Sequence, residues 1–199
     1  MASSTVNEAE AHRFFSARCF NRAWDLIRKS NRTTIECEQM LQLSQASLWH
    51  WTQRSDCTPK NLSIGNWQLS RIYALLGQAE NALRSARMCL RYSENTSPFF
   101  IGHAHEALAR SAAVAEDDVG KAHHLAEARR YLAQVRDDGD RALLQADLES
   151  LEGEAAARRS TRTHTGGRSP TGVRRLACFV RRPQNIESIG HVSKYQDPF

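Results

Sequence analysis

The chain of 199 residues lacks long apolar runs and a leader-like beginning. No stretch approaches the roughly 20 apolar residues needed to cross a bilayer, the best being alanine-rich pieces such as residues 112–115. Residues 1–11 hold no basic segment followed by an apolar run, as a secretory signal would. We therefore expect a soluble protein that has no membrane partner.

The chain also lacks a C-x-x-C pair. The five cysteines are widely spaced and odd in number: Cys19, Cys37, Cys57, Cys89 and Cys178. Such spacing favours reduced thiols rather than a disulfide framework or a zinc site. We expect a cytoplasmic location.

The usual short motifs of catalysis are missing. The chain has no glycine-rich phosphate loop and no Gly-x-Ser-x-Gly elbow. A zinc-protease helix needs a second histidine four residues after His105, and Ala109 occupies that place. His103 and His105 point to nearly opposite helix faces, and His123 and His124 diverge by about 100°. We therefore expect no metal, no cofactor and no enzyme.

Charge divides the chain into two parts. Residues 153–199 contain nine basic residues (Lys and Arg) and three acidic residues (Asp and Glu). Residues 1–152 contain eighteen basic and nineteen acidic residues. The second part is rich in Thr, Ser, Gly, Arg and Pro, with one short apolar island at residues 176–180. It offers too little apolar surface to offset the entropy cost of ordering, about 1–2 kcal/mol per residue. We expect a folded domain at 1–152 and a disordered basic tail at 153–199.

The first part shows helical periodicity and no sustained two-residue alternation of the kind that predicts a strand. Capping and breaking residues divide it into seven predicted helices at about residues 7–29, 34–53, 63–76, 79–92, 98–115, 119–135 and 138–151. Short connections place consecutive helices antiparallel. The predicted fold class is all-α, made of helical hairpins.

Several boundaries carry recognisable signals. Thr33 or Thr34 can cap the second helix, with Glu36 in its first turn. Gly77 can close the third helix in a left-handed conformation, and Pro98 suits the first turn of the fifth. Residues 55–61 are expected to form a turn that contains a proline.

A leucine, a small residue and an arginine recur 39 positions apart, as residues 69–71 and 108–110. This repetition suggests repeated hairpins and favours a binding scaffold. Around the first copy stand Leu69, Ser70, Tyr73, Leu76, Gly77, Ala82, Cys89 and Leu90. With Ser63 as its first position, this unit resembles the tetratricopeptide repeat, although Asn66 and Glu94 replace its usual tryptophan and proline. A weaker unit begins near Gly102 and keeps Leu108, Ala109 and Ala122.

Residues 12–151 also resemble a group of small bacterial proteins with no assigned activity. The shared segments are His50-Trp51, residues 67–73 and residues 106–110. The tetratricopeptide resemblance implies a right-handed array whose first helices line a concave groove. Motif positions that commonly face this groove correspond to Ile64, Trp67, Gln68 and Arg71, and to His103, Glu106, Ala107 and Arg110.

Trp67, Gln68, Arg71, His103, Glu106 and Arg110 are therefore the predicted partner-binding residues. Trp67 and Arg71 share a helix face, so an indole and a guanidinium would point outward together. The alternative interpretation is that Arg110 pairs with Glu106 four residues earlier and that Trp67 packs between repeats.

His50 and Trp51 form a second candidate, an aromatic patch that either cages a ligand or seals the first hairpin. The predicted function is a non-catalytic scaffold that binds a protein or peptide, as a monomer or homodimer. One alternative is a nucleic-acid-associated protein that binds through its basic tail. Another is an enzyme with a pocket between the second, third and fifth helices that holds His50 and Glu106. Arg159 and His164 have a spacing seen in some helical ribonucleases, but they lie in the predicted tail.

Overall fold

The computed structural model describes residues 7–162, with side chains for residues 7–153. This part of the chain forms seven helices and no strand, which confirms the all-α prediction. The helices are α1 (Glu8–Arg28), α2 (Thr34–Thr52), α3 (Pro59–Leu75), α4 (Ala79–Ser93), α5 (Pro98–Val114), α6 (Asp118–Leu132) and α7 (Asp138–Arg162).

Local signals set most of these boundaries. The Thr33 hydroxyl accepts a hydrogen bond from the Glu36 backbone amide, and the Glu36 carboxylate accepts one from the Thr33 amide, which is a complete capping box. Gly77 adopts a φ of 72° after α3, where glycine carries no Cβ penalty. Pro98 is the first residue of α5, where its missing N–H costs no hydrogen bond.

Helix α3 begins earlier than predicted, at Pro59 rather than Ser63. Asn61 Oδ1 accepts hydrogen bonds from the Thr58 backbone amide and hydroxyl, at 2.9 and 2.6 Å. This cap and a proline in the first turn start the helix inside the expected turn, because a first-turn proline is compatible with a helix.

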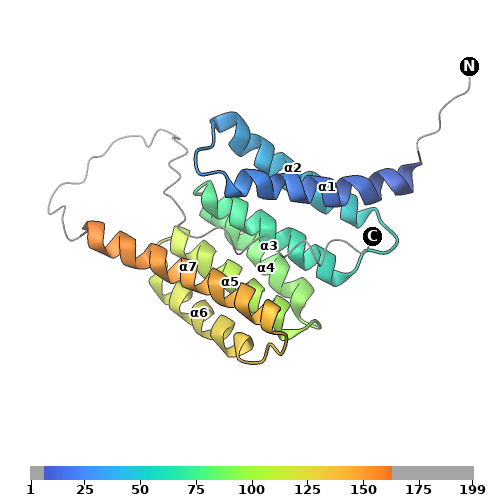
Figure 1. Ribbon diagram of the computed structural model, residues 1–199. Helices are drawn as coiled ribbons and strands as arrows, with labels where there is room; N and C mark the ends of the chain where they lie inside the picture. The colour runs from blue at the N-terminus through green and yellow to red at the C-terminus, as the bar shows by residue number, and fades with distance from the viewer. Residues whose placement is uncertain (1–6, 163–199) are drawn as a thin grey trace, which may run out of the picture.

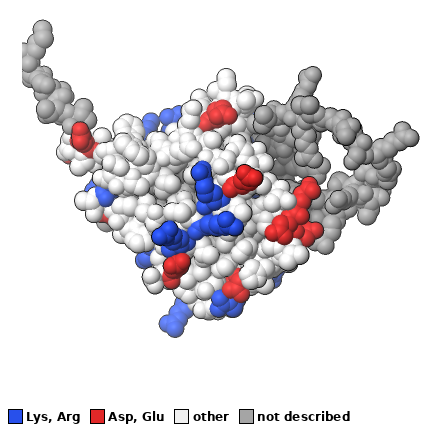
Figure 2. All heavy atoms as spheres, turned by 180° about the vertical axis from the view of Figure 1, so that it is seen from behind, with Lys and Arg blue, Asp and Glu red and all other residues white. Residues whose placement is uncertain are grey.

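The helices pack as three hairpins, α1/α2, α3/α4 and α5/α6, with α3 against α5 and α7 against both α5 and α6 (Figure 1). The larger of two apolar clusters among the described residues runs through the stack. Its members include Phe20, Trp24, Met40, Ile72, Leu108 and Leu144. The side of the molecule turned away from the view of Figure 1 carries Lys and Arg near its middle, with Asp and Glu around them (Figure 2).

Helix α7 reaches the core because α5 has no side chain at one contact point. A Cβ on Gly102 would lie 2.4 Å from Leu144 Cδ2, closer than real Cβ atoms approach their neighbours. Leu144 is fully buried there. Gly102 therefore permits α5 and α7 to approach closely.

Helix α7 ends at Arg162, whereas the sequence places the change of character at Gly153. The helix continues through Glu154, Ala155, Ala156 and Ala157, residue types with high helix propensity. The rest of the predicted tail lies outside the described residues, as do His164 and the apolar island. In the part of the chain that the structure describes, no helix is both long and apolar enough to span a membrane.

Candidate functional site

The two repeated arginines meet in one cluster of charged side chains. Arg71 comes from α3, Glu106 and Arg110 come from α5, and Asp147 comes from α7. Residues 106 and 110 are four apart and therefore share a helix face. We call these four residues the ion cluster.

Glu106 is the centre of the ion cluster and is fully buried. Its Oε1 accepts hydrogen bonds from Nε and Nη2 of Arg110, at 2.8 and 2.6 Å. Its Oε2 accepts one from Trp67 Nε1 at 2.8 Å. Arg71 Nη1 lies 3.9 Å from Oε1. Both carboxylate oxygens of Glu106 thus accept hydrogen bonds from side chains of the protein itself.

Asp147 completes the cluster from α7. Its Oδ1 accepts a hydrogen bond from Arg71 Nη1 at 2.9 Å. Burial alone would raise the pKa of Asp147, but the charges around it, with that of Arg71 foremost, hold this pKa below its ordinary value. Two guanidinium groups therefore face two carboxylates, and the cluster is electrically balanced.

His103 lies beside the ion cluster. Burial lowers its pKa, although Asp147 and Glu106 act in the opposite direction. Its ring contacts Phe99 at 4.5 Å and Trp67 at 5.1 Å between centroids. Neither ring nitrogen has a hydrogen-bond partner among the described residues, and Nδ1 is 3.7 Å from Asp147 Oδ2.

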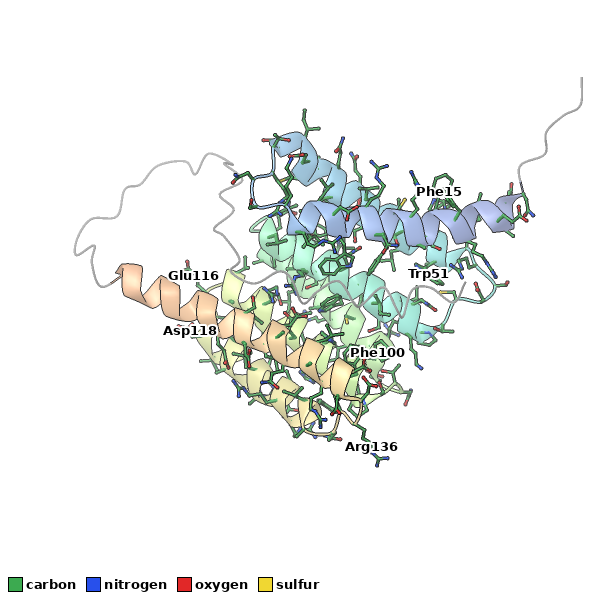
Figure 3. All side chains as sticks on the ribbon, viewed as in Figure 1. Phe15, Trp51, Phe100, Glu116, Asp118 and Arg136 are labelled. Atoms are coloured by element: carbon green, nitrogen blue, oxygen red, sulfur yellow. The ribbon has the colours of Figure 1, made fainter. Side chains whose placement is uncertain are left out.

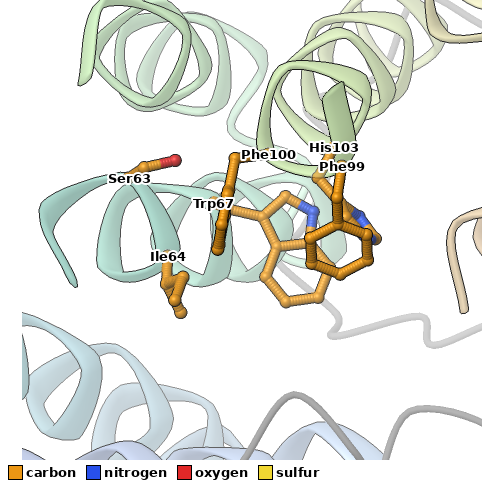
Figure 4. A pocket seen from close by; sticks show the side chains of 6 residues that line it. All are labelled: Ser63, Ile64, Trp67, Phe99, Phe100 and His103. Atoms are coloured by element: carbon orange, nitrogen blue, oxygen red, sulfur yellow. The ribbon is translucent and has the colours of Figure 1, made fainter. Parts of the chain in front are cut away.

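A small cavity borders His103 between α3 and α5 (Figure 4). Its volume is about 10 Å³, which is room for about one water molecule. Trp67 and Phe99, which both contact the His103 ring, are part of the cavity lining. The cavity is therefore too small to hold a substrate.

The predicted partner-binding residues do not line an open groove. Their exposed fractions are 3% for Trp67, 0% for Gln68, 6% for Arg71, 6% for His103, 0% for Glu106 and 6% for Arg110. The structure brings the two arginines together, as the repeat suggests, but encloses them rather than presenting them outward. Trp24 of α1 lies 5.9 Å from the Arg71 guanidinium, and α7 lies against α5.

Gln68 connects two helices outside the ion cluster. Its Nε2 donates a hydrogen bond to the backbone carbonyl of Phe20 at 3.1 Å, which ties α3 to α1. The pairing of Arg110 with Glu106 that sequence spacing allows is present. Asp147 was not among the predicted site residues, and no local pattern marks it, because its partner lies 76 positions away.

The predicted pair His50 and Trp51 is divided between two environments. Trp51 is 1% exposed and lies beneath the Arg54 guanidinium, 3.7 Å from its ring centroid. His50 instead contacts His12 of α1, with 2.8 Å between their Nδ1 atoms. Burial and the neighbouring His12 lower the pKa of His50. The partners of Glu106 lie on α3 and α5. His50 and Glu106, which the enzyme alternative places in one pocket, therefore belong to different clusters.

Trp49 was not among the predicted site residues, and it is 55% exposed. Phe14 and Phe15 of α1 are 55% and 42% exposed. With His12 and His50 these rings form a connected surface group, which we call the aromatic patch (Figure 3 labels Phe15). Their sequence signal was weak because exposed aromatic residues at one end of an amphipathic helix resemble core residues.

Residues 7–153 contain no group of three or more His, Cys, Asp or Glu side chains with the geometry of a metal site. No protein-family model matches the chain, and neither does any curated protein or solved structure. The resemblance to tetratricopeptide and small bacterial proteins therefore stays a prediction.

Proposed function

We propose that the chain is a non-catalytic scaffold that binds a protein or peptide through the aromatic patch. The observation that carries this proposal is the exposure of three large rings, Phe14, Phe15 and Trp49, in one connected group. Contiguous exposed apolar groups of this kind mark interaction sites on soluble proteins. Aromatic residues also supply most of the energetically dominant contacts of interfaces.

The ion cluster supports the same proposal in another way. Its two cations are matched by two buried carboxylates, so it offers no unbalanced charge to an incoming partner. It fixes α3, α5 and α7 relative to one another. We therefore assign the cluster to the framework and the aromatic patch to recognition.

Charge beside the patch defines the chemistry of the partner. Phe14, Arg18 and Arg22 follow one another at four-residue steps and form one exposed stripe of α1. The Arg18 guanidinium lies 5.4 Å from the Phe14 ring, and the described residues give Arg18 and Arg22 no ion pair. A partner segment that combines apolar side chains with Asp or Glu complements this stripe.

Two synthetic amphipathic peptides test the proposal. They share the same apolar residues, and one carries glutamates at the positions where the other carries lysines. We expect the acidic peptide to bind more tightly, measured by fluorescence anisotropy. Trp49→Ser should weaken its binding by about 2 kcal/mol, roughly thirtyfold. Arg18→Glu with Arg22→Glu should reverse the preference. Val119→Ser is the matched control, because Val119 is 82% exposed on a different hairpin.

Equal binding of the two peptides, or equal losses in the Trp49 and Val119 variants, would contradict the proposal. Sedimentation of the chain alone provides a further check. If it forms a dimer that Trp49→Ser dissociates, the patch is an interface between copies and the proposed partner is wrong.

A further inference from the structure

A larger hollow opens where the end of α2, the start of α3 and the start of α5 meet. Its volume is about 190 Å³, and its walls include Trp51, Lys60 and Phe100. Figure 3 places Trp51 and Phe100 toward the same end of the molecule. Typical pockets for drug-sized ligands measure about 300–1,000 Å³, so this hollow suits a smaller molecule.

One wall is held rigidly by Arg54. Its Nε and Nη2 donate hydrogen bonds to the two Asp56 carboxylate oxygens, at 2.8 and 2.7 Å. Its Nη1 donates one to Ser16 Oγ at 2.8 Å, and the guanidinium lies over Trp51. These bonds hold the pKa of Asp56 at about 2, chiefly through the Arg54 hydrogen bonds. The charges of Arg54 and Asp56 therefore cancel within the wall.

Lys60 supplies the remaining charge. It is exposed in the first turn of α3, and its Nζ lies 5.8 Å from the Phe100 ring centroid. The described residues provide no ion-pair partner for it. By contrast, Lys29 at the end of α1 pairs with Glu36. The hollow thus combines one uncompensated cation with walls that the Arg54 hydrogen bonds already hold in place.

We propose that this hollow binds a small monocarboxylate with an apolar body. The carboxylate pairs with Lys60 Nζ, and the apolar body lies in the hollow beside Phe100. A dianion such as phosphate fits less well because Lys60 compensates one negative charge only and because phosphate has no apolar body. Binding requires little reorganisation, since Arg54 and the Thr58 cap already fix the walls.

The test compares four probes added to the full chain: phenylacetate, the uncharged phenylacetamide, acetate and inorganic phosphate. We expect phenylacetate to bind with one-to-one stoichiometry in calorimetry, and each of the other three to bind more weakly. Lys60→Met should weaken phenylacetate binding by about twofold to fivefold, the range for an exposed ion pair. Lys60→Glu should make phenethylammonium the preferred ligand. Arg87→Met is the control, because Arg87 is exposed on α4 without an ion pair.

Circular dichroism establishes that each variant is folded. The proposal is overturned if phenylacetamide binds as well as phenylacetate, if phosphate binds more tightly, or if Arg87→Met has the same effect as Lys60→Met. Absence of saturable binding also overturns it. Because Lys60 belongs to neither the aromatic patch nor the ion cluster, this outcome is independent of the proposed scaffold function.

Discussion

Replacement of Glu106 by leucine tests the structural role of the ion cluster. The change removes the acceptor of one Trp67 and two Arg110 hydrogen bonds and leaves one carboxylate for two buried guanidinium groups. Removing one partner of a buried ion pair costs about 3–5 kcal/mol, because the other charge remains in the interior. We expect a loss of that size, a large share of the roughly 5–15 kcal/mol that stabilises a typical domain.

Urea denaturation followed by far-UV circular dichroism measures the loss directly. For a domain of this size each 1 kcal/mol lowers the melting temperature by about 2–4 °C, so the decrease should be roughly 6–20 °C. Glu106→Gln should cost less, since the amide oxygen can still accept a hydrogen bond. Glu127→Gln is the matched control: Glu127 pairs with Arg130 on the surface, and its removal should leave the denaturation midpoint unchanged.

The double variant Glu106→Leu with Arg110→Leu tests whether an unpaired buried charge causes this loss of stability. It leaves Arg71 paired with Asp147 and restores charge balance. We expect it to be more stable than Glu106→Leu alone, because apolar replacement of a whole buried pair is often neutral. A single variant that loses under about 1 kcal/mol, or a double variant less stable than the single one, refutes the assignment of the cluster to the framework.

Three further predictions concern stability. Gly102→Ala should lower the denaturation midpoint despite better helix propensity, because the added Cβ meets the buried Leu144; an increase would show that α7 moves freely. Gly77→Ala should cost about 1–2 kcal/mol in urea denaturation because φ is 72°, and a neutral result would contradict that turn. The pKa of His105 is lowered to about 4, mainly by burial and then by His124, so the unfolded chain binds more protons between about pH 6.5 and 4. The unfolding free energy should therefore fall as pH decreases through this window, and His105→Gln should flatten the slope; an unchanged slope would exclude His105 as its source.

The burial of the two arginines could not be predicted from the sequence. The recurrence of Arg71 and Arg110 indicates that the two side chains share a role, and the spacing of Glu106 and Arg110 allows their ion pair. Nothing near either arginine indicates that Asp147 or Trp24 reaches them. A pattern that places side chains on one helix face does not say which other helix covers that face.

The all-helical class and most helix boundaries could be predicted from local patterns, because periodicity, the Thr33 capping box, Pro98 and Gly77 act within a few residues of their own positions. The packing of the helices, in contrast, encloses Arg71 and Arg110, brings His50 against His12, and leaves Phe14 and Trp49 exposed. Burial and charge pairing depend on contacts between distant helices, such as α3 with α7, and therefore exist only once the hairpins have packed.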